Sequence, residues 1–543
     1  MVVGNQGWQR VTLTMLVALL LMGAGLTIDD ISADSSSVVS GVVVNQAGQP
    51  LVDAHVRVRA TDNLTYTSAD GRFMLTGLTP GLGVEIAAWD SGGYYIAGQV
   101  ITPPVSGITL TLRPYHTQDN PDYVWLEPTA NPSVTLQCGN CHTPILPQWQ
   151  TNAHGTATSN PRFFSLYNGT DLTGTITLSP GFKLDFPGVA GNCATCHAPG
   201  AAANAPFNTD VNTVRGNVTA TMHCDFCHKV GGIYLNPTTR VPYANAPGVL
   251  SLRLLRPPAG DQIFFGPYDD IKDPDTFLPE MTQSAYCAPC HSFTFWGTPI
   301  YQSYNEWLAS PYAAKGVECQ ACHMPPNGDH YFVPPERGGL WHPTEKIPSH
   351  LDLGSKDTAF MQNTVAMTLT AQSIVNTVQV SVTLTNVGAG HHVPTDHPGR
   401  HMILTIQAMD EAGQPLTQLS GPIVPDWGGA QSGLPGQAFA KVLQDVASGQ
   451  APVINYWKQT RIISDSRIPA MGSAASTYTF LAPASGGSIT VTAELRFRRA
   501  FASLMETKGW DTADVVMETE QVAVAAPTWW GVYLPLVLAE HPR

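Results

Sequence analysis

The chain has few charged side chains, and it has no cysteine outside one repeated motif. Asp, Glu, Lys and Arg together make up 13% of the 543 residues, and acidic residues outnumber basic ones, which gives a formal net charge of −14. A chain of this sign repels phosphate backbones, which argues against nucleic-acid binding and favours a cationic or neutral partner. No cysteine precedes Cys138, so we expect no lipid anchor attached through cysteine.

All ten cysteines belong to five Cys-x-x-Cys-His units. Two thiols at this spacing can each add across one vinyl group of the same porphyrin while the adjacent imidazole reaches the iron, so the motif indicates covalently attached haem c. Paired cysteines also hold zinc or form disulfides, but neither requires a histidine after the second cysteine in every unit. We therefore predict five haem c groups, each with its motif histidine as the proximal iron ligand. The units are Cys138, Cys141 and His142; Cys193, Cys196 and His197; Cys224, Cys227 and His228; Cys287, Cys290 and His291; Cys319, Cys322 and His323.

The segment from residue 37 to 114 has short alternating apolar runs, such as AHVRVRA and GITLTLRP, separated by turn sequences. This pattern predicts a small β-sandwich. The stretches SGVVVNQAGQPLVDAHVRV and TSADGRFMLTGLTPG resemble the carboxypeptidase regulatory-like domain, a β-sandwich appended to many exported proteins. The resemblance implies no catalysis, because this region has no His/Glu metal constellation.

Residues 116–355 contain all five motifs and show little helical periodicity beyond short segments such as 304–314. Haem macrocycles would supply the apolar filling that such an irregular backbone lacks, so we predict a pentahaem cytochrome domain with short helices. Residues 360–525 return to a β pattern, as in TVQVSVTLTN, and predict a second, larger β-sandwich. A tail at 526–543 follows, and its apolar part falls short of the roughly 20 residues that span a bilayer.

The N-terminus resembles an export signal. Val11–Ile28 is an uncharged, largely apolar run that follows a single arginine, and polar residues begin at Asp29. We predict a signal peptide over residues 1–34, with an uncleaved membrane anchor as the alternative. Haem c attachment outside the cytoplasm agrees with export, so we expect a periplasmic, cell-surface or extracellular protein that meets the membrane only through such an uncleaved segment.

The stretch from Asn120 to Met324 resembles multihaem cytochromes c of the cytochrome c554 and hydroxylamine-oxidoreductase-like group. The likeness lies in CGNCH with QWQTNAH, in CDFCHKV and in YNEWLASPYAAKGVECQACHMP. The segment NVGAGHHVPTDHPGR resembles the β-domain appended to many such cytochromes. Together these resemblances imply electron transfer outside the cytoplasm.

The same resemblance implies that His154, His350 and His391 are distal ligands, on the far side of the iron from a motif histidine. The chain has 17 histidines and only five belong to motifs, a surplus that favours irons held by two histidines. His223, directly before Cys224, is a further candidate, with a hydrogen-bonding role beside the motif as the alternative. The Gly-Ala-Gly-His loop that carries His391 could reach the haem domain and lock the two domains together.

One position departs from the group. Related chains often place histidine where this chain has Tyr312, which leaves one iron open or served from elsewhere. An open iron would allow an oxidoreductase that acts on a small nitrogen or sulfur oxyanion. The chain has no Cys-x-x-Cys-Lys unit, which is how pentahaem nitrite reductases ligate their catalytic iron, and this argues against such an enzyme.

The sequence thus favours an exported, multidomain pentahaem cytochrome c that transfers single electrons through closely spaced, mainly bis-His haems. We expect an electron carrier rather than a catalyst. The multihaem oxidoreductase is one alternative, and a surface-attached adhesion or docking subunit that bears haem is another. Expected partners are redox proteins or an extracellular electron acceptor, and an oligomer or filament is compatible with the sequence.

Overall fold

The N-terminal part of the computed structural model consists of two small sheets that share one core. The structure describes residues 37–527, apart from residues 135 and 177–178. One sheet has the strand order β4-β1-β7 and the other β3-β2-β5-β6. Side chains that alternate inward, such as Val39 and Val43, pack with Val56 and Ile86 of the facing sheet. The strands are β1 (Ser37–Asn45), β2 (His55–Val58), β3 (Leu64–Tyr66), β4 (Arg72–Leu78), β5 (Val84–Trp89), β6 (Ala97–Ile101) and β7 (Val105–Leu112).

The motif-bearing region in the middle of the chain has little regular structure. Its longest described helix, α3 (Pro161–Asn168), has eight residues. Buried residues form several small clusters that are rich in aromatic side chains rather than one aliphatic core. Three short strand pairs lie between the helices: β8 (Val230–Ile233) with β9 (Leu252–Leu254), β10 (Phe264–Gly266) with β11 (Asp275–Phe277), and β12 (Phe293–Phe295) with β13 (Thr298–Tyr301).

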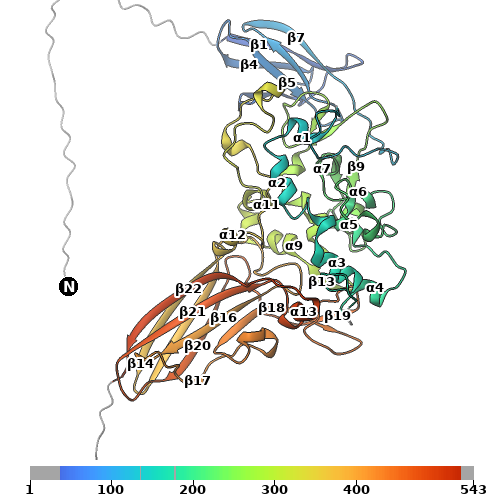
Figure 1. Cartoon of the computed structure of the whole chain (residues 1–543). Helices are drawn as coiled ribbons and strands as arrows, with labels where there is room; N and C mark the ends of the chain where they lie inside the picture. The colour runs from blue at the N-terminus through green and yellow to red at the C-terminus, as the bar shows by residue number, and fades with distance from the viewer. Residues whose placement is uncertain (1–36, 135, 177–178, 528–543) are drawn as a thin grey trace, which may run out of the picture.

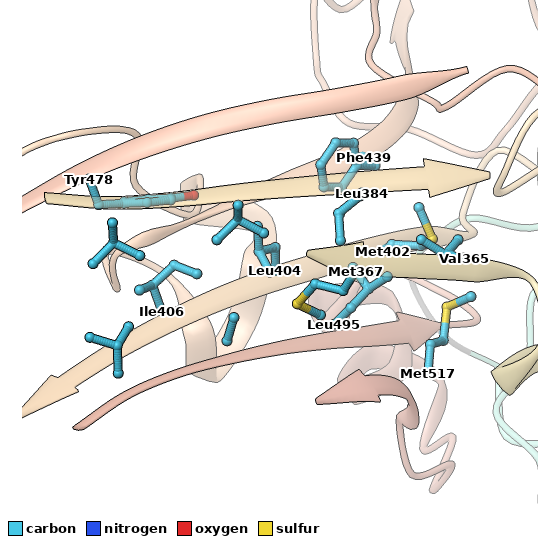
Figure 2. Packing of buried hydrophobic residues seen from close by; sticks show 14 of the residues in the cluster. Val365, Met367, Leu384, Met402, Leu404, Ile406, Phe439, Tyr478, Leu495 and Met517 are labelled. Carbon is cyan, nitrogen blue, oxygen red and sulfur yellow. The ribbon is translucent and has the colours of Figure 1, made fainter. Parts of the chain in front are cut away.

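The C-terminal part is a larger pair of sheets. One has the order β14-β15-β20-β17 and the other β19-β18-β16-β21-β22. Figure 2 shows the side chains that fill the space between them, among them Met367, Leu404, Tyr478 and Leu495. The elements are β14 (Val365–Ile374), β15 (Thr377–Asn386), β16 (His401–Met409), β17 (Gln418–Ser420), β18 (Gly436–Asp445), β19 (Thr460–Asp465), β20 (Ser473–Leu481), β21 (Ser488–Arg498), β22 (Val515–Ala525) and α13 (Ala502–Lys508).

The three parts follow one another in space as they do in the sequence, with the motif-bearing region in the middle (Figure 1). The N-terminal sheets contact it through ion pairs: Asp269 lies 2.7 Å from Nδ1 of His55 and 2.8 Å from Nε of Arg57. On the other side, Lys441 of β18 donates to the carbonyl oxygens of Pro299 and Ile300 at 3.0 Å. Both β parts are therefore held by buried or half-buried polar contacts.

The predicted fold class is confirmed in outline, as a multidomain chain with many sheets and few helices. Within the described residues, no helix is long and apolar enough to cross a membrane. The predicted signal peptide at 1–34 lies outside the described residues, and so does all of the predicted tail beyond residue 527.

Candidate haem-binding centre

Each motif folds as a single helical turn. In the first four motifs, the backbone N–H of the motif histidine donates to the carbonyl of the first cysteine four residues earlier, at 2.9–3.1 Å, and in the fifth the two residues are the ends of one helix, Cys319–His323. The two cysteines therefore lie on the same face of the turn, as attachment to one porphyrin requires. None of the ten cysteines forms a disulfide. The turns are α1 (Cys138–Cys141), α5 (Ala194–His197), α7 (Cys224–Cys227), α8 (Ala288–His291) and α11 (Cys319–His323).

Local sequence explains where several of these short helical turns begin or end. Pro289 lies at the start of α8, where the missing N–H costs nothing. The ring of His223 caps α7, because its Nδ1 accepts from the Phe226 amide at 3.3 Å. Helix α5 ends at its cap residue Ala198, which precedes Pro199 at the start of α6 (Pro199–Ala202), because the residue before a proline avoids helical geometry.

The motif histidines are oriented by hydrogen bonds at Nδ1. Nδ1 of His142 lies 3.1 Å from the carbonyl oxygen of Phe332, and that of His228 lies 2.7 Å from the carbonyl oxygen of Phe265. Nδ1 of His323 lies 2.6 Å from the carbonyl oxygen of residue 353. A donor bond from Nδ1 fixes the tautomer that leaves Nε2 free to bind a metal.

The other two motif histidines have different surroundings. His197 stacks on Phe163, with ring centroids 4.0 Å apart and 14° between the planes. Nδ1 of His291 lies 3.1 Å from Oδ2 of Asp396, which belongs to the C-terminal part of the chain. Burial lowers the pKa of His197 and of His228 to about 4, so both are neutral near pH 7, the form that binds metal.

The ring of His391 lies near the ring of His323 and is almost parallel to it. The centroids are 6.3 Å apart and the planes are within 15° of parallel. Metal–imidazole bonds are about 2 Å long, so a metal held between two Nε2 atoms separates the ring centroids by about 6 Å. Nδ1 of His391 lies 2.8 Å from the carbonyl oxygen of His392, which again leaves Nε2 free. These residues fit an iron with two histidine ligands.

Thiols of different motifs lie near one another. The thiols of Cys138 and Cys224, of Cys196 and Cys290, and of Cys287 and Cys319 lie close enough to shift the pKa of one another. The hydroxyl of Tyr286, just before the fourth motif, donates to the carbonyl oxygen of Cys227 in the third at 2.8 Å. In space the motifs therefore run first, third, fourth and second, with the fifth beside the fourth.

His154 and His350 lie close together around one half-buried carboxylate, that of Asp352. Nδ1 of His154 is 2.8 Å from Oδ2 of Asp352, and the Asn152 amide donates to the carbonyl oxygen of His350 at 2.7 Å. Burial lowers the pKa of His350, and positive charge on His142 lowers it further. The two predicted ligands thus lie beside the motif region, in the neighbourhood of the first and third motifs.

The surroundings of His223 differ from those of the other candidates. Its side chain is fully buried, 5.2 Å from the ring of Trp125, and a Cβ added at Gly200 would lie 3.0 Å from its Nε2. Among the described residues its Nε2 has no hydrogen-bond partner, which fits a ligand, while the bond from the Phe226 amide to its Nδ1 fits the hydrogen-bonding alternative, so both predictions for His223 stand. Tyr312, which stands where relatives place histidine, donates its hydroxyl to the carbonyl oxygen of Val387 at 2.7 Å.

Sequence reasoning missed two polar residues at this centre, Asp352 and Asp396, and it favours a structural or exposed role for a third, His397. Burial, followed by the charge of Arg400, lowers the pKa of His397 to about 3, and His197 of the second motif is near enough to contribute. The phrase TDHPGR contains Asp396 and His397, but their contacts depend on how the C-terminal sheets dock. No local signal in the sequence identifies them.

Comparisons with known proteins agree with this geometry. Residues 137–229 match the sequence family described as cytochrome c554 and c-prime. A penta-heme cytochrome c552 from Thermochromatium tepidum has a similar structure, with 20% sequence identity and a TM-score of 0.53, over 71% of this chain and 97% of that chain. At this identity the likeness is one of fold. No curated protein matches the chain.

Two other solved structures are far less similar. A family 123 glycoside hydrolase from Clostridium perfringens matches 31% of this chain and 28% of its own, with 8% identity and a TM-score of 0.15. MtrC from Shewanella baltica matches 91% of this chain and 68% of its own, with 11% identity and a TM-score of 0.15. Neither bears on the fold.

The motif turns, the oriented imidazoles and these matches define a multihaem c-type cytochrome. Within that class, the stretch that holds the first three motifs carries the sequence pattern of the cytochrome c554 and c-prime family. The chain therefore binds haem c, and the class of protein is one that transfers electrons.

Proposed function

We propose that the protein is an exported pentahaem cytochrome c that relays single electrons. The observation that carries this proposal is the closeness of successive motifs: the Tyr286 hydroxyl beside the fourth motif donates to the carbonyl oxygen of Cys227 of the third at 2.8 Å, and thiols of different motifs lie near one another, Cys138 and Cys224, Cys196 and Cys290, and Cys287 and Cys319. A thioether sulfur is separated from its porphyrin ring by one carbon atom, so sulfurs near one another bring neighbouring rings close together. Bound haem c supplies one-electron chemistry at iron.

The chain's own residues would attach, orient and insulate each group. The cysteines at positions 138, 141, 193, 196, 224, 227, 287, 290, 319 and 322 would hold five porphyrins, and the five motif histidines would bind iron from one side. His391 would bind the iron of the fifth motif from the other side, supported by its 6.3 Å spacing from His323. His154, His350 and His223 are the next candidates, and the buried Nε2 of His223 has no hydrogen-bond partner among the described residues.

The order of motifs in space suggests a route for electrons. The first motif lies at one end, beside the third, and the fourth motif lies near both the second and the fifth. Cys141 of the first motif is the exposed member among the ten cysteines. An electron would enter or leave near this motif and pass through the third to the fourth, where the route divides.

The two β parts would position this relay on a partner. Their buried cores need no haem, and both contact the motif region through polar groups. We infer a redox protein or an extracellular electron acceptor as the partner, in the periplasm, at the cell surface or outside the cell. The likeness of the N-terminal part to the carboxypeptidase regulatory-like domain supports docking rather than catalysis.

Low-temperature electron paramagnetic resonance with spin quantitation, together with haem content per chain, tests the proposal. Five haems, all low-spin, would support a relay in which every iron has two side-chain ligands. One high-spin iron would instead support an oxidoreductase with an open site, and nitrogen and sulfur oxyanions should then be screened as substrates. Fewer than five haems would refute the pentahaem assignment.

A further inference from the structure

The side chain of Asp396 connects the C-terminal β part to the fourth motif. Asp396 lies in the loop between β15 and β16, and its Oδ2 is 3.1 Å from Nδ1 of His291. The two residues are 105 positions apart in the sequence. A carboxylate from one part of the chain thus holds the proximal histidine of another part.

This pairing distinguishes the fourth motif from the others. His142, His228 and His323 have backbone carbonyl oxygens as their Nδ1 partners, and His197 stacks on an aromatic ring. Among the five motif histidines, His291 has the carboxylate partner. A carboxylate draws the Nδ1 proton more strongly than a neutral carbonyl does, and so makes the imidazole a stronger electron donor.

Several contacts fix the position of the carboxylate. The backbone N–H groups of Gln302 and Ser303 each donate to Oδ1 at 3.1 Å, and the Ser303 hydroxyl donates to Oδ2 at 3.1 Å. The residue is 8% exposed. Its φ of +60° lies in the left-handed region, which residues other than glycine rarely adopt. A disfavoured backbone held by four hydrogen bonds indicates a position that the surrounding structure specifies closely.

We propose that Asp396 is a positioning residue that strengthens His291 as an iron ligand and thereby lowers the reduction potential of the haem at the fourth motif. The inference rests on the proposed attachment of haem at Cys287 and Cys290. A more anionic axial ligand stabilises ferric over ferrous iron, which is one of the means by which proteins tune haem potentials.

The position of this haem gives the tuning a consequence. The fourth motif lies near the second, where Cys196 and Cys290 are neighbours, and beside the fifth, where the Cys319 amide donates to the Ser284 hydroxyl at 2.8 Å. An electron that reaches a haem of low reduction potential moves on to a neighbouring haem of higher potential, where it is more stable. By lowering the potential of the haem at the fourth motif, Asp396 would keep that haem oxidised and favour electron transfer to the haem at the second or fifth motif.

The experiment is a spectroelectrochemical redox titration of the full-length protein, followed by its paramagnetic resonance spectrum, on wild type and Asp396→Asn. Asparagine keeps an oxygen that can accept from His291 but removes the charge. We expect five haems per chain in both proteins and a shift of one midpoint potential to a higher value, with the others unchanged. The same haem should show altered g values while it stays low-spin.

Glu306→Gln is the matched control. Glu306 also anchors this loop, since its Oε2 accepts from the His392 amide at 3.2 Å and from the Thr395 hydroxyl at 2.7 Å, but it is not a partner of His291. An equal shift in Glu306→Gln would assign the effect to movement of the loop and overturn the proposal. An unchanged potential in Asp396→Asn would overturn it as well.

A second variant, Ser303→Ala, covers the case in which Asp396→Asn does not fold. It removes a hydrogen bond to the Oδ2 atom that faces His291, so the carboxylate should draw the Nδ1 proton more strongly. One midpoint potential should then move to a lower value, and a shift upward or none would overturn the proposal. Absence of haem from the fourth motif in wild type would refute the proposed function instead, and haem content measures this separately.

Discussion

Replacing Arg467 by methionine tests how firmly the C-terminal β part holds the motif region. Nη1 of Arg467 lies 2.7 Å from Oε1 of Glu306, and the two side chains are 5% and 7% exposed. Without the guanidinium, the buried Glu306 carboxylate would keep the His392 amide and the Thr395 hydroxyl, with the His392 ring 3.7 Å away and the Lys441 charge nearby. Breaking a buried pair from one side costs about 3–5 kcal/mol. The second partner of Arg467, Asp465, is 33% exposed and would regain water at little cost.

Equilibrium unfolding in guanidinium chloride, followed by far-ultraviolet circular dichroism, measures this cost. The double variant Arg467→Met/Glu306→Gln should recover part of the loss, because it leaves no buried charge without a partner. The control is Arg496→Met, which breaks the more exposed Arg496–Glu494 pair on β21. We expect a loss below about 1 kcal/mol there, as for other pairs near the surface.

Two results would refute the reasoning. A loss below about 1 kcal/mol in Arg467→Met would mean that the pair is hydrated in solution and does not fasten the two parts together. A double variant no more stable than the single one would mean that the loss comes from packing and not from an unpaired Glu306 carboxylate. If the pair does fasten the loop that carries His391, Arg467→Met should also give a partial high-spin signal.

Three further predictions concern single side chains. His391→Ala should convert one low-spin iron to high-spin in the resonance spectrum at unchanged haem content, and an unchanged spectrum would discard this ligand. Lys229→Met should lower the free energy of unfolding by about 3–5 kcal/mol, because Asp225 lies 2.5 Å from Lys229 and both side chains are fully buried. The double variant Lys229→Met/Asp225→Asn should recover part of this loss. Burial lowers the pKa of Lys441 from 10.5 to about 8. Between these two pH values the unfolded chain holds a proton on Lys441 that the folded chain has lost, so the free energy of unfolding should rise by about 3 kcal/mol from pH 8 to 10.5. In Lys441→Met this rise should be absent, and a variant with the same pH dependence of unfolding as wild type would contradict the prediction.

The parts of the fold that follow from local sequence were predictable. The alternation in TVQVSVTLTN becomes the alternating burial of β15, because side chains in a strand point to opposite faces in turn. The spacing of each motif becomes one helical turn with both cysteines on one face. These features depend on residues a few positions apart, so a single sequence is sufficient to predict them.

The axial surroundings of the haems were only partly predictable. His391 was proposed from its motif, but its placement opposite His323 depends on how the C-terminal sheets dock. The pairing of Asp396 with His291 spans 105 residues, and neither segment carries a local signal for the other. Long-range contacts of this kind have no periodicity or spacing from which they can be read.

The contrast between the parts of the chain explains why these long-range contacts matter. Each β part has a continuous apolar core of its own, whereas the motif region has several small clusters and many half-buried cysteines and imidazoles. A region without a sufficient core gains its stability from groups that bind to it, so its folding is coupled to haem attachment. The loop between β15 and β16 places His391 beside His323 of the fifth motif and Asp396 beside His291 of the fourth. Under the proposed function, docking of the C-terminal part would complete these haem sites, and we predict that variants that loosen it lower haem saturation before they unfold either β part.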